Sequence, residues 1–371
     1  MKVAFNNLKQ QYLKIKDQLQ PKLQECFEKS NFILGEPVNV FEQNFAQYTG
    51  TSHAIAVSNG TDAMKLALLA MELKGKTAIY IQANTYAATV LSSVVAYPKS
   101  KIFLIDIDKY QQLDLKILEN KLKSNKTKYK NHVIVPVHMF GNMCDMENLL
   151  KIAEKYRAIV MEDASQAHGT MGKDGKKAGS YGLISAFSLY PGKNLGAFGD
   201  AGIITTDNDE LKNRVKMLRH LGQKEKFYHD VLGFNHRMDT IQAIILDQKL
   251  KYLDEWNLSR KNIADFCIKT IDNKSLKLPQ PTPFCLKHTW HVFYVMTNHV
   301  KELVEHLKKH DVEYNFHYPV PVEMMKPFLD LKQNNKKARS FSKSHVSIPI
   351  HPFMERDEIE YVCDVLNRFH P

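Results

Sequence analysis

The chain has 371 residues and a formal net charge of +11 at pH 7, with 44% hydrophobic and 25% charged residues. This length is typical of two domains, and the composition is typical of a globular protein. We expect a cytoplasmic protein without a signal peptide or a membrane span, because no apolar run approaches the roughly 20 residues that cross a bilayer.

Between residues 53 and 206, short apolar runs alternate with helical patterns. Runs rich in Ile and Val, typical of buried strands, occupy 77–83, 101–106, 132–138, 158–164, 183–190 and 201–206. Helical spacing of apolar residues is found at 60–73, 87–96 and 145–156. This alternation predicts a largely parallel sheet with helices on both faces.

The pattern changes after residue 235. Residues 238–271 read as long helical sequence, and prolines at 279, 281 and 283 then indicate the entry to a second domain. The remainder predicts a small α+β unit with a strand at 290–296 and helices at 300–310 and 358–369.

One lysine stands out between two of the predicted strands. Lys193 lies in a segment that contains Gly192, Gly196, Gly199 and Gly202, with apolar runs on both sides. Desolvation at such a place would lower the pKa of the amine toward the range of a nucleophile, as a Schiff-base lysine requires. The alternative is a solvated surface charge, since the chain has 51 lysines and arginines.

Three further positions favour an anionic, planar ligand near that lysine. Asp163 ends a predicted strand, where a carboxylate is able to hold a pyridine nitrogen protonated; the alternative is a capping or loop acid. Gly60 and Thr61 open a helix whose free N–H groups suit a phosphate, although Asn59 or Thr61 also suits ordinary capping. The Tyr86 ring follows a strand and would either stack on a ligand or join the core.

Other classes of site are disfavoured. The five cysteines stand singly, with no Cys-x-x-Cys pair, and His288 and His291 would face opposite sides of a strand, so we expect no metal site. No glycine-rich dinucleotide motif follows a first strand, and no Walker loop is present. The positive charge alone would suit a nucleic-acid binder or regulator, but no recognised nucleic-acid motif accompanies it, so we expect none to bind.

Several longer stretches narrow the interpretation. They are 31–35 (NFILG), 57–63 (VSNGTDA), 136–141 (PVHMFG), 162–169 (EDASQAHG), 187–202 and 233–239 (GFNHRMD). Together and in this order they resemble the DegT/DnrJ/StrS family of nucleotide-sugar aminotransferases, which depend on pyridoxal phosphate (PLP). The resemblance implies an aspartate-aminotransferase-like fold (fold type I) with a mostly parallel seven-stranded α/β sheet. It also implies a large PLP-binding domain at 1–250 with an N-terminal helical arm, and a small α+β domain at 251–371.

The resemblance also implies roles for individual residues. Lys193 would hold PLP through a Schiff base and move the proton, and Asp163 would pair with the pyridinium nitrogen. Gln166 would lie near the ring oxygen, Tyr86 would stack on the ring, and Gly60, Thr61 and Ser188 would bind the phosphate. Asn235 would reach the phosphate of a neighbouring subunit, which implies a homodimer with shared sites. Tyr190, Arg219, His317 and Tyr318 would contact the substrate.

The implied reaction moves the amino group of L-glutamate to a keto carbon of a nucleotide-linked 6-deoxyhexose, for surface-polysaccharide or glycan biosynthesis. The segment 163–169, with glutamine at position 166, resembles the branch that aminates C-3 of dTDP-3-keto-6-deoxyhexoses. The branch that aminates C-4 of dTDP- or UDP-sugars more often has histidine in place of Gln166. A PLP-dependent sugar dehydratase is a further alternative, but that branch replaces the lysine with histidine. The chain departs from the family at Glu323 and Met324, where a histidine is common, so contacts on the nucleotide side stay open.

Overall fold

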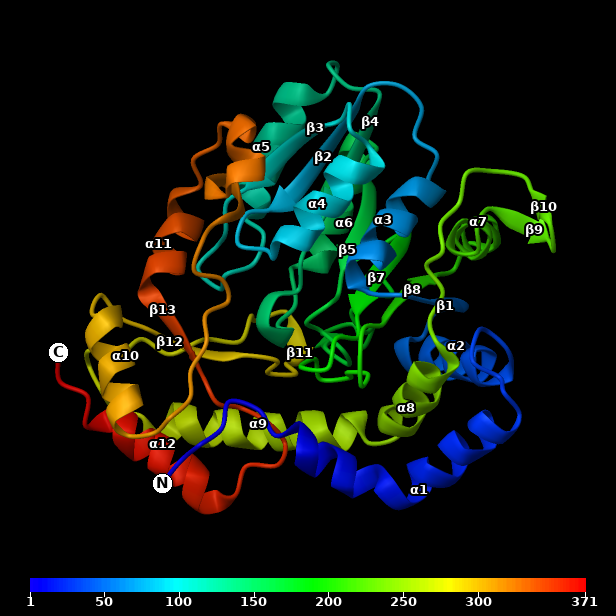
Figure 1. The fold of residues 1–371 in the computed structure, drawn as a ribbon. Coiled ribbons are helices and arrows are strands. Elements are labelled where there is room, and N and C mark those ends of the chain that lie inside the picture. Colours follow the sequence, from blue (N-terminus) through cyan, green and yellow to red (C-terminus); the bar gives the residue numbers. More distant parts are fainter.

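The computed structural model describes residues 1–371, which are arranged around a seven-stranded sheet of order β1-β8-β7-β5-β4-β2-β3 (Figure 1). The strands are β1 (His53–Val57), β2 (Thr77–Gln82), β3 (Lys101–Ile105), β4 (Asn131–Val135), β5 (Ile159–Asp163), β7 (Ile184–Ser188) and β8 (Gly202–Thr206). β8 is antiparallel to both β1 and β7, and the other neighbouring pairs are parallel. The mostly parallel α/β sheet predicted from the sequence is therefore confirmed.

Helices cover both faces of this sheet (Figure 1). Strand residues alternate between two buried clusters: Ile79 and Ile81 belong to one, and Ala78 and Tyr80 to the other. The first cluster includes residues of α3 (Gly60–Ala70), α4 (Ala87–Ala96) and α7 (Asp209–Arg219). The second includes residues of α2 (Glu36–Thr49), α5 (Leu115–Asn125), α6 (Met146–Tyr156) and α8 (Thr240–Leu250). Burial on both faces explains why the strands read as nearly continuous apolar runs.

The C-terminal part is a smaller unit built on the long helix α9 (Leu253–Thr270). An antiparallel pair, β12 (Phe293–Met296) with β13 (His345–Ile348), packs with α10 (Val300–Lys309) and α12 (Arg356–Asn367). α11 (Lys336–Ser344) and the short 3₁₀ helices η2 (Val322–Met324) and η3 (Lys326–Leu331) complete it, while η1 (Met139–Gly141) follows β4 of the large sheet. β11 (Cys285–Lys287) pairs back onto β6 (Met171–Gly172).

The N-terminal segment connects the two parts. Val3 pairs with Val312 beside the small unit's core, and α1 (Leu8–Glu28) then runs along α8 (Figure 1). A hairpin of β9 (Gln223–Glu225) and β10 (Tyr228–His229) projects from the body next to α7. In this fold no helix is both long enough and apolar enough to cross a membrane.

Most predicted elements are present, but the structure also contains helices that were not predicted, among them α2, α5 and α7, and it differs at three further points. β1 was not predicted as a strand, and the helical run 238–271 is two helices, α8 and α9. The strand predicted at 290–296 begins only at Phe293, because Trp290 adopts a positive φ of 46° that a strand does not accommodate. Leu253 packs in the sheet's core and Ile263 in the small unit's core, so α9 spans both; the domain division at 250/251 stays a prediction.

Candidate active site

A cavity of about 810 Å³ lies at one edge of the sheet. Because β8 alone is reversed, the carboxyl ends of β1, β2, β4, β5 and β7 meet at this edge, which is where open α/β sheets bind ligands. Ten residues singled out from the sequence line the cavity: Gly60, Thr61, Tyr86, Asp163, Gln166, Ser188, Tyr190, Lys193, His317 and Tyr318.

Lys193 is held in a tight loop between β7 and β8. Its backbone N–H donates to the carbonyl of Tyr190 at 2.9 Å, and Ala197 N–H donates to the carbonyl of Leu189 at 2.8 Å. Burial lowers the pKa of the Lys193 amine to about 8, although the nearby Asp163 carboxylate acts in the opposite direction. A lowered pKa increases the neutral fraction of the amine near neutral pH, as a nucleophilic lysine requires.

The neighbouring Asn194 anchors the lysine loop to the C-terminal half of the chain. Its buried amide donates to Asn257 Oδ1 on α9 at 2.8 Å and to the carbonyl of Thr289 at 2.9 Å. Asn194 Oδ1 lies 3.0 Å from Nδ1 of His291, which lines the cavity. These bonds fix the backbone on one side of Lys193, so the amine enters the cavity from a rigid support.

Asp163 ends β5 with its carboxylate held in place. Thr89 Oγ1 donates to Oδ2 at 2.8 Å, and the backbone N–H of Ser165 donates to Oδ1 at 3.1 Å. The preceding residue, Glu162, points to the other face of β5 and pairs there with fully buried His138 at 2.9 Å. These adjacent acids therefore have different surroundings: Glu162 stabilises the core, and Asp163 faces the cavity.

The start of α3 lies directly against the end of β7. A Cβ on Gly60 would lie 2.5 Å from the Ser188 Cβ and 2.8 Å from its Cα, so only glycine allows this approach. Asn59 caps the helix by accepting from Asp62 N–H at 2.8 Å, which leaves the first N–H groups next to the Ser188 hydroxyl. Helix start and hydroxyl together form a polar recess suited to a phosphate.

Aromatic and amide groups close the cavity from the other side. The rings of Tyr86 and Tyr318 lie 5.1 Å apart between centroids, and Tyr86 is 57% exposed, so it is not a core residue. Gln166 donates through Nε2 to the Tyr318 hydroxyl at 3.0 Å and accepts from Phe140 N–H at 2.7 Å. Gln166 therefore joins the large sheet to the segment that carries His317.

Arg219 and Asn235 do not line the cavity. The Arg219 guanidinium is buried against the Glu42 carboxylate and the carbonyl of Ala56 in this subunit, so its contact with substrate stays a prediction. Asn235 is exposed and pairs with His220 at the base of the β9–β10 hairpin.

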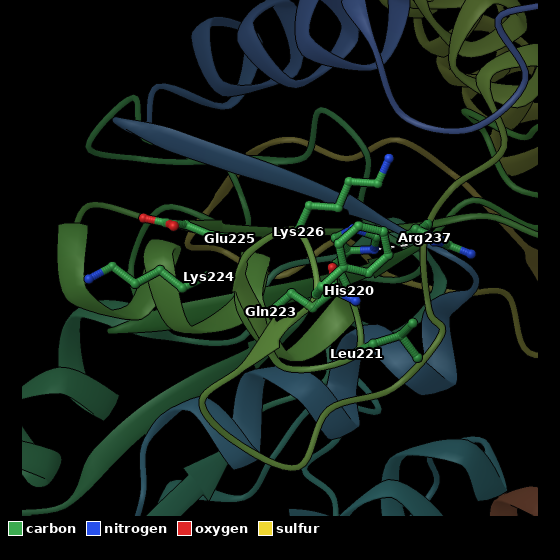
Figure 2. A pocket seen from close by; sticks show the side chains of 8 residues that line it. His220, Leu221, Gln223, Lys224, Glu225, Lys226 and Arg237 are labelled. Atoms are coloured by element: carbon green, nitrogen blue, oxygen red, sulfur yellow. Dashed lines mark hydrogen bonds between the residues drawn. The ribbon is translucent and has the colours of Figure 1, made fainter.

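A second, smaller cavity of about 370 Å³ lies in that hairpin. Arg237 donates to His220 Nδ1 at 3.2 Å inside it, while Lys224 and Glu225 extend away from this pair (Figure 2). The hairpin region also exposes Phe227 (78%) and Leu232 (95%).

Sequence reasoning gave no cavity role to four residues that shape the main cavity or its support, although it weighed and rejected one of them, His291, as a metal ligand. These are Thr89, Asn194, Arg260 and His291. Only Arg260 carried a usable signal: it falls on the buried stripe of α9 with Trp256, Asn257, Ile263 and Ala264, where a charged residue is unusual.

Comparison with known proteins identifies the family. Residues 13–367 match the DegT/DnrJ/EryC1/StrS aminotransferase family. The chain belongs to this family. It is 36% identical over 368 residues to the dTDP-3-amino-3,6-dideoxy-alpha-D-galactopyranose transaminase of Aneurinibacillus thermoaerophilus, covering 99% of both chains. It is 31% identical over 372 residues to the dTDP-3-amino-3,4,6-trideoxy-alpha-D-glucose transaminase of Streptomyces venezuelae, covering 99% of this chain and 96% of the relative.

Two solved structures agree with the fold. S. venezuelae DesV, solved in complex with a ketimine intermediate, superposes with a TM-score of 0.92 at 31% identity, covering 99% of this chain and 98% of that one. NtdA of Bacillus subtilis, solved with bound cofactor PMP, gives 0.88 at 26% identity, covering 98% and 84%. The chain is therefore a PLP-dependent sugar aminotransferase with the fold predicted from its sequence.

The cavity fits this cofactor on its own geometry. It contains an amine of lowered pKa on Lys193, a carboxylate with fixed orientation on Asp163, and a helix start at Gly60 where a Cβ is excluded. When bound, PLP supplies an electron sink that weakens the bonds at an amino-bearing carbon. The protein's part is to orient reactants and to place a base that moves the proton.

Proposed function

We propose that this aminotransferase moves the amino group of L-glutamate to C-3 of a dTDP-linked 3-keto-6-deoxyhexose. The products are 2-oxoglutarate and a dTDP-3-amino-3,6-dideoxyhexose, which a glycan or surface-polysaccharide pathway would consume. The main support is the cavity that combines Lys193, Asp163 and Gln166 in a chain 36% identical to a transaminase named for such a sugar.

Each residue of the cavity has a role in this proposal. Lys193 holds the cofactor and, once released, carries the proton between the donor or sugar carbon and the cofactor carbon, which its lowered pKa favours. Asp163, oriented by Thr89, keeps the ring nitrogen protonated. Gly60, Thr61 and Ser188 bind the phosphate.

The remaining cavity residues contact the ring or the sugar nucleotide. Tyr86 packs on the ring, and Gln166 lies beside its phenolic oxygen. Tyr190, His317 and Tyr318 face the sugar nucleotide. Burial lowers the pKa of His317 to about 3, so it is a neutral partner for the substrate.

We also propose a homodimer in which Asn235 completes the phosphate site of the partner. Its exposed position near Phe227 and Leu232, which are 78% and 95% exposed, supports contact with a second copy. Mixing inactive Lys193→Ala with Asn235→Asp protein tests this: if sites are shared, hybrids contain one intact site and activity reappears. Two variants that stay inactive after subunit exchange would refute shared sites.

The reaction itself is tested with dTDP-3-keto and dTDP-4-keto 6-deoxyhexoses, each with glutamate, in matched incubations. We expect 2-oxoglutarate in excess over the enzyme, the mark of repeated turnover, only with the 3-keto sugar, together with an amine at C-3 by NMR. An amine at C-4 alone would refute amination at C-3, and sugar turnover without 2-oxoglutarate would favour a dehydratase.

The role of Lys193 is tested by substitution. Lys193→Ala should bind PLP without the absorbance band of the covalent Schiff base, and an unchanged band would refute Lys193 as the residue that binds PLP.

A further inference from the structure

Arg260 is a buried cation that none of these roles uses. Its side chain is 5% exposed, yet it lines the same cavity as Lys193. It comes from the middle of α9, on the face that packs toward the cavity and the small unit's core. One N–H of its guanidinium donates to the carbonyl of Ile350, just after β13, which fixes the group in position.

The guanidinium has no acidic partner in the chain. None of the ion pairs includes Arg260, whereas buried Arg219 pairs with Glu42. Its remaining N–H groups make no hydrogen bond and are not sealed from the cavity. A buried charge without a partner is strongly disfavoured, and such groups are normally paired or used to bind an anion.

The groups that face Arg260 are neutral around pH 7. Burial lowers the pKa of His351 to about 4, and burial with the nearby Lys193 holds the pKa of His291 well below its usual value. Burial lowers the pKa of Arg260 itself only to about 10, so it remains charged. Arg260 therefore presents one positive charge among uncharged imidazoles.

The few cations in the cavity indicate which anion Arg260 binds. Arg260 and Lys193 are the only Lys or Arg side chains that line the cavity, and Lys193 is taken by the cofactor in the proposed function. An anionic amino-acid donor must nevertheless enter this cavity. We propose that Arg260 binds a carboxylate of the amino donor and so selects an acidic amino acid. This inference rests on the proposed function, whose donor is glutamate.

The geometry favours a carboxylate over the diphosphate of the sugar nucleotide. A single guanidinium with one edge fixed on the Ile350 carbonyl offers a planar fork that matches one carboxylate. A diphosphate carries more charge and would need several cations, which this subunit's part of the cavity wall does not supply. Asn315 and Asn6 also line the cavity and offer amide donors for the carboxylate's remaining lone pairs.

Binding of glutarate, a dicarboxylate without an amino group, tests the inference on the holoenzyme by calorimetry. Arg260→Gln should weaken glutarate binding about 30-fold or more, and Arg260→Lys, which keeps the charge but not the fork, should weaken it less. Lys261→Gln is the matched control, because Lys261 is the next residue on α9 and pairs only with Asp265 on the exposed face. It should bind glutarate as the wild type does.

Separate measurement of the reactions with glutamate and with keto sugar distinguishes recognition of the donor by Arg260 from a purely structural role of this residue. Conversion of the PLP form by glutamate, followed by absorbance without any sugar, should slow about 30-fold or more in Arg260→Gln with a raised half-saturating concentration. The aminated enzyme should still react with keto sugar within about threefold of the wild type. Equal loss in both half-reactions would overturn the inference in favour of structure, and loss with the sugar alone would overturn it in favour of the diphosphate.

The proposed function fails by a different result. If wild-type holoenzyme does not react with glutamate, the donor assignment is refuted whatever Arg260 does. If the wild type reacts and Arg260→Gln and Arg260→Lys both bind glutarate normally, only the inference about Arg260 is refuted. Should Arg260→Gln fold poorly, Arg260→Lys, which keeps the positive charge, carries the comparison.

Discussion

Substituting Gly60 with alanine tests whether the start of α3 is the phosphate site. The new Cβ would lie 2.5 Å from the Ser188 Cβ, so helix and strand must separate by about 1 Å to reach ordinary contact. Gly182→Ala is a matched control with a similar clash, 2.8 Å from the carbonyl of Val160, at the opposite end of β7. Only Gly60→Ala should distort the cavity, because Gly60 lines it and Gly182 does not.

The stability loss should be similar in both variants. Overpacking of this kind costs about 1–3 kcal/mol. For 371 residues the unfolding entropy is about 0.8 kcal/mol/K, so the melting temperature should fall by about 1–4 °C. In Gly60→Ala alone, the separation should also lengthen one or two hydrogen bonds to the phosphate, each contributing about 1.5–3 kcal/mol. PLP affinity should then fall between roughly 10-fold and a few hundredfold.

The assay titrates apoprotein with PLP and, in parallel, with pyridoxal, which lacks the phosphate. Gly60→Ala should lose affinity for PLP but bind pyridoxal as the wild type does, and Gly182→Ala should bind both normally. Equal loss for PLP and pyridoxal, or normal PLP binding by Gly60→Ala, would refute the placement of the phosphate at this helix start.

Three other substitutions give distinct outcomes. Thr89→Val removes the hydroxyl that donates to Asp163 at 2.8 Å, and we expect PLP affinity to fall roughly 10-fold in the same titration. Glu162→Gln breaks the buried pair with His138 and should lower the free energy of unfolding in urea by about 3–5 kcal/mol at pH 7. Because the pair lowers the pKa of Glu162, that deficit should shrink as pH falls below 4.5; a constant deficit would contradict this cause. Burial lowers the pKa of Lys249 from 10.5 to about 7, so the unfolded chain binds more protons between those values. The stability of the wild type relative to Lys249→Met should therefore rise with pH in that window. If the difference in urea midpoint between the two proteins is the same at pH 7.5 and 9.5, this reasoning is refuted.

Sequence patterns predicted the sheet well because burial on both faces leaves a strong local signal. The run at 158–164 became β5, and helix 87–96 was predicted to the residue. β1 was not predicted because His53–Val57 is a short run with two alanines, and its place beside β8 depends on a long-range pairing.

The residues of the candidate site were predicted unevenly for a physical reason. Asp163 ends β5, and Lys193 lies in the glycine-rich loop between β7 and β8; both positions follow from local sequence patterns. Thr89 reaches Asp163 across 74 residues, and that contact exists only in the folded chain. The pairing of Arg219 with Glu42, 177 residues away, likewise leaves no signal in the local sequence.

The sharing of α9 between two cores limits how this chain can be recombined with its relatives. A chimera joined near residue 250 would keep α9 with one parent while its first turns pack on the sheet of the other, through Leu253. The same junction would also separate Tyr294 and Phe341 from the cluster they share with the large sheet, and Val3 from the small unit. Exchange of substrate preference between family members should therefore succeed with grafts of single cavity segments, such as the one carrying His317, rather than with whole halves.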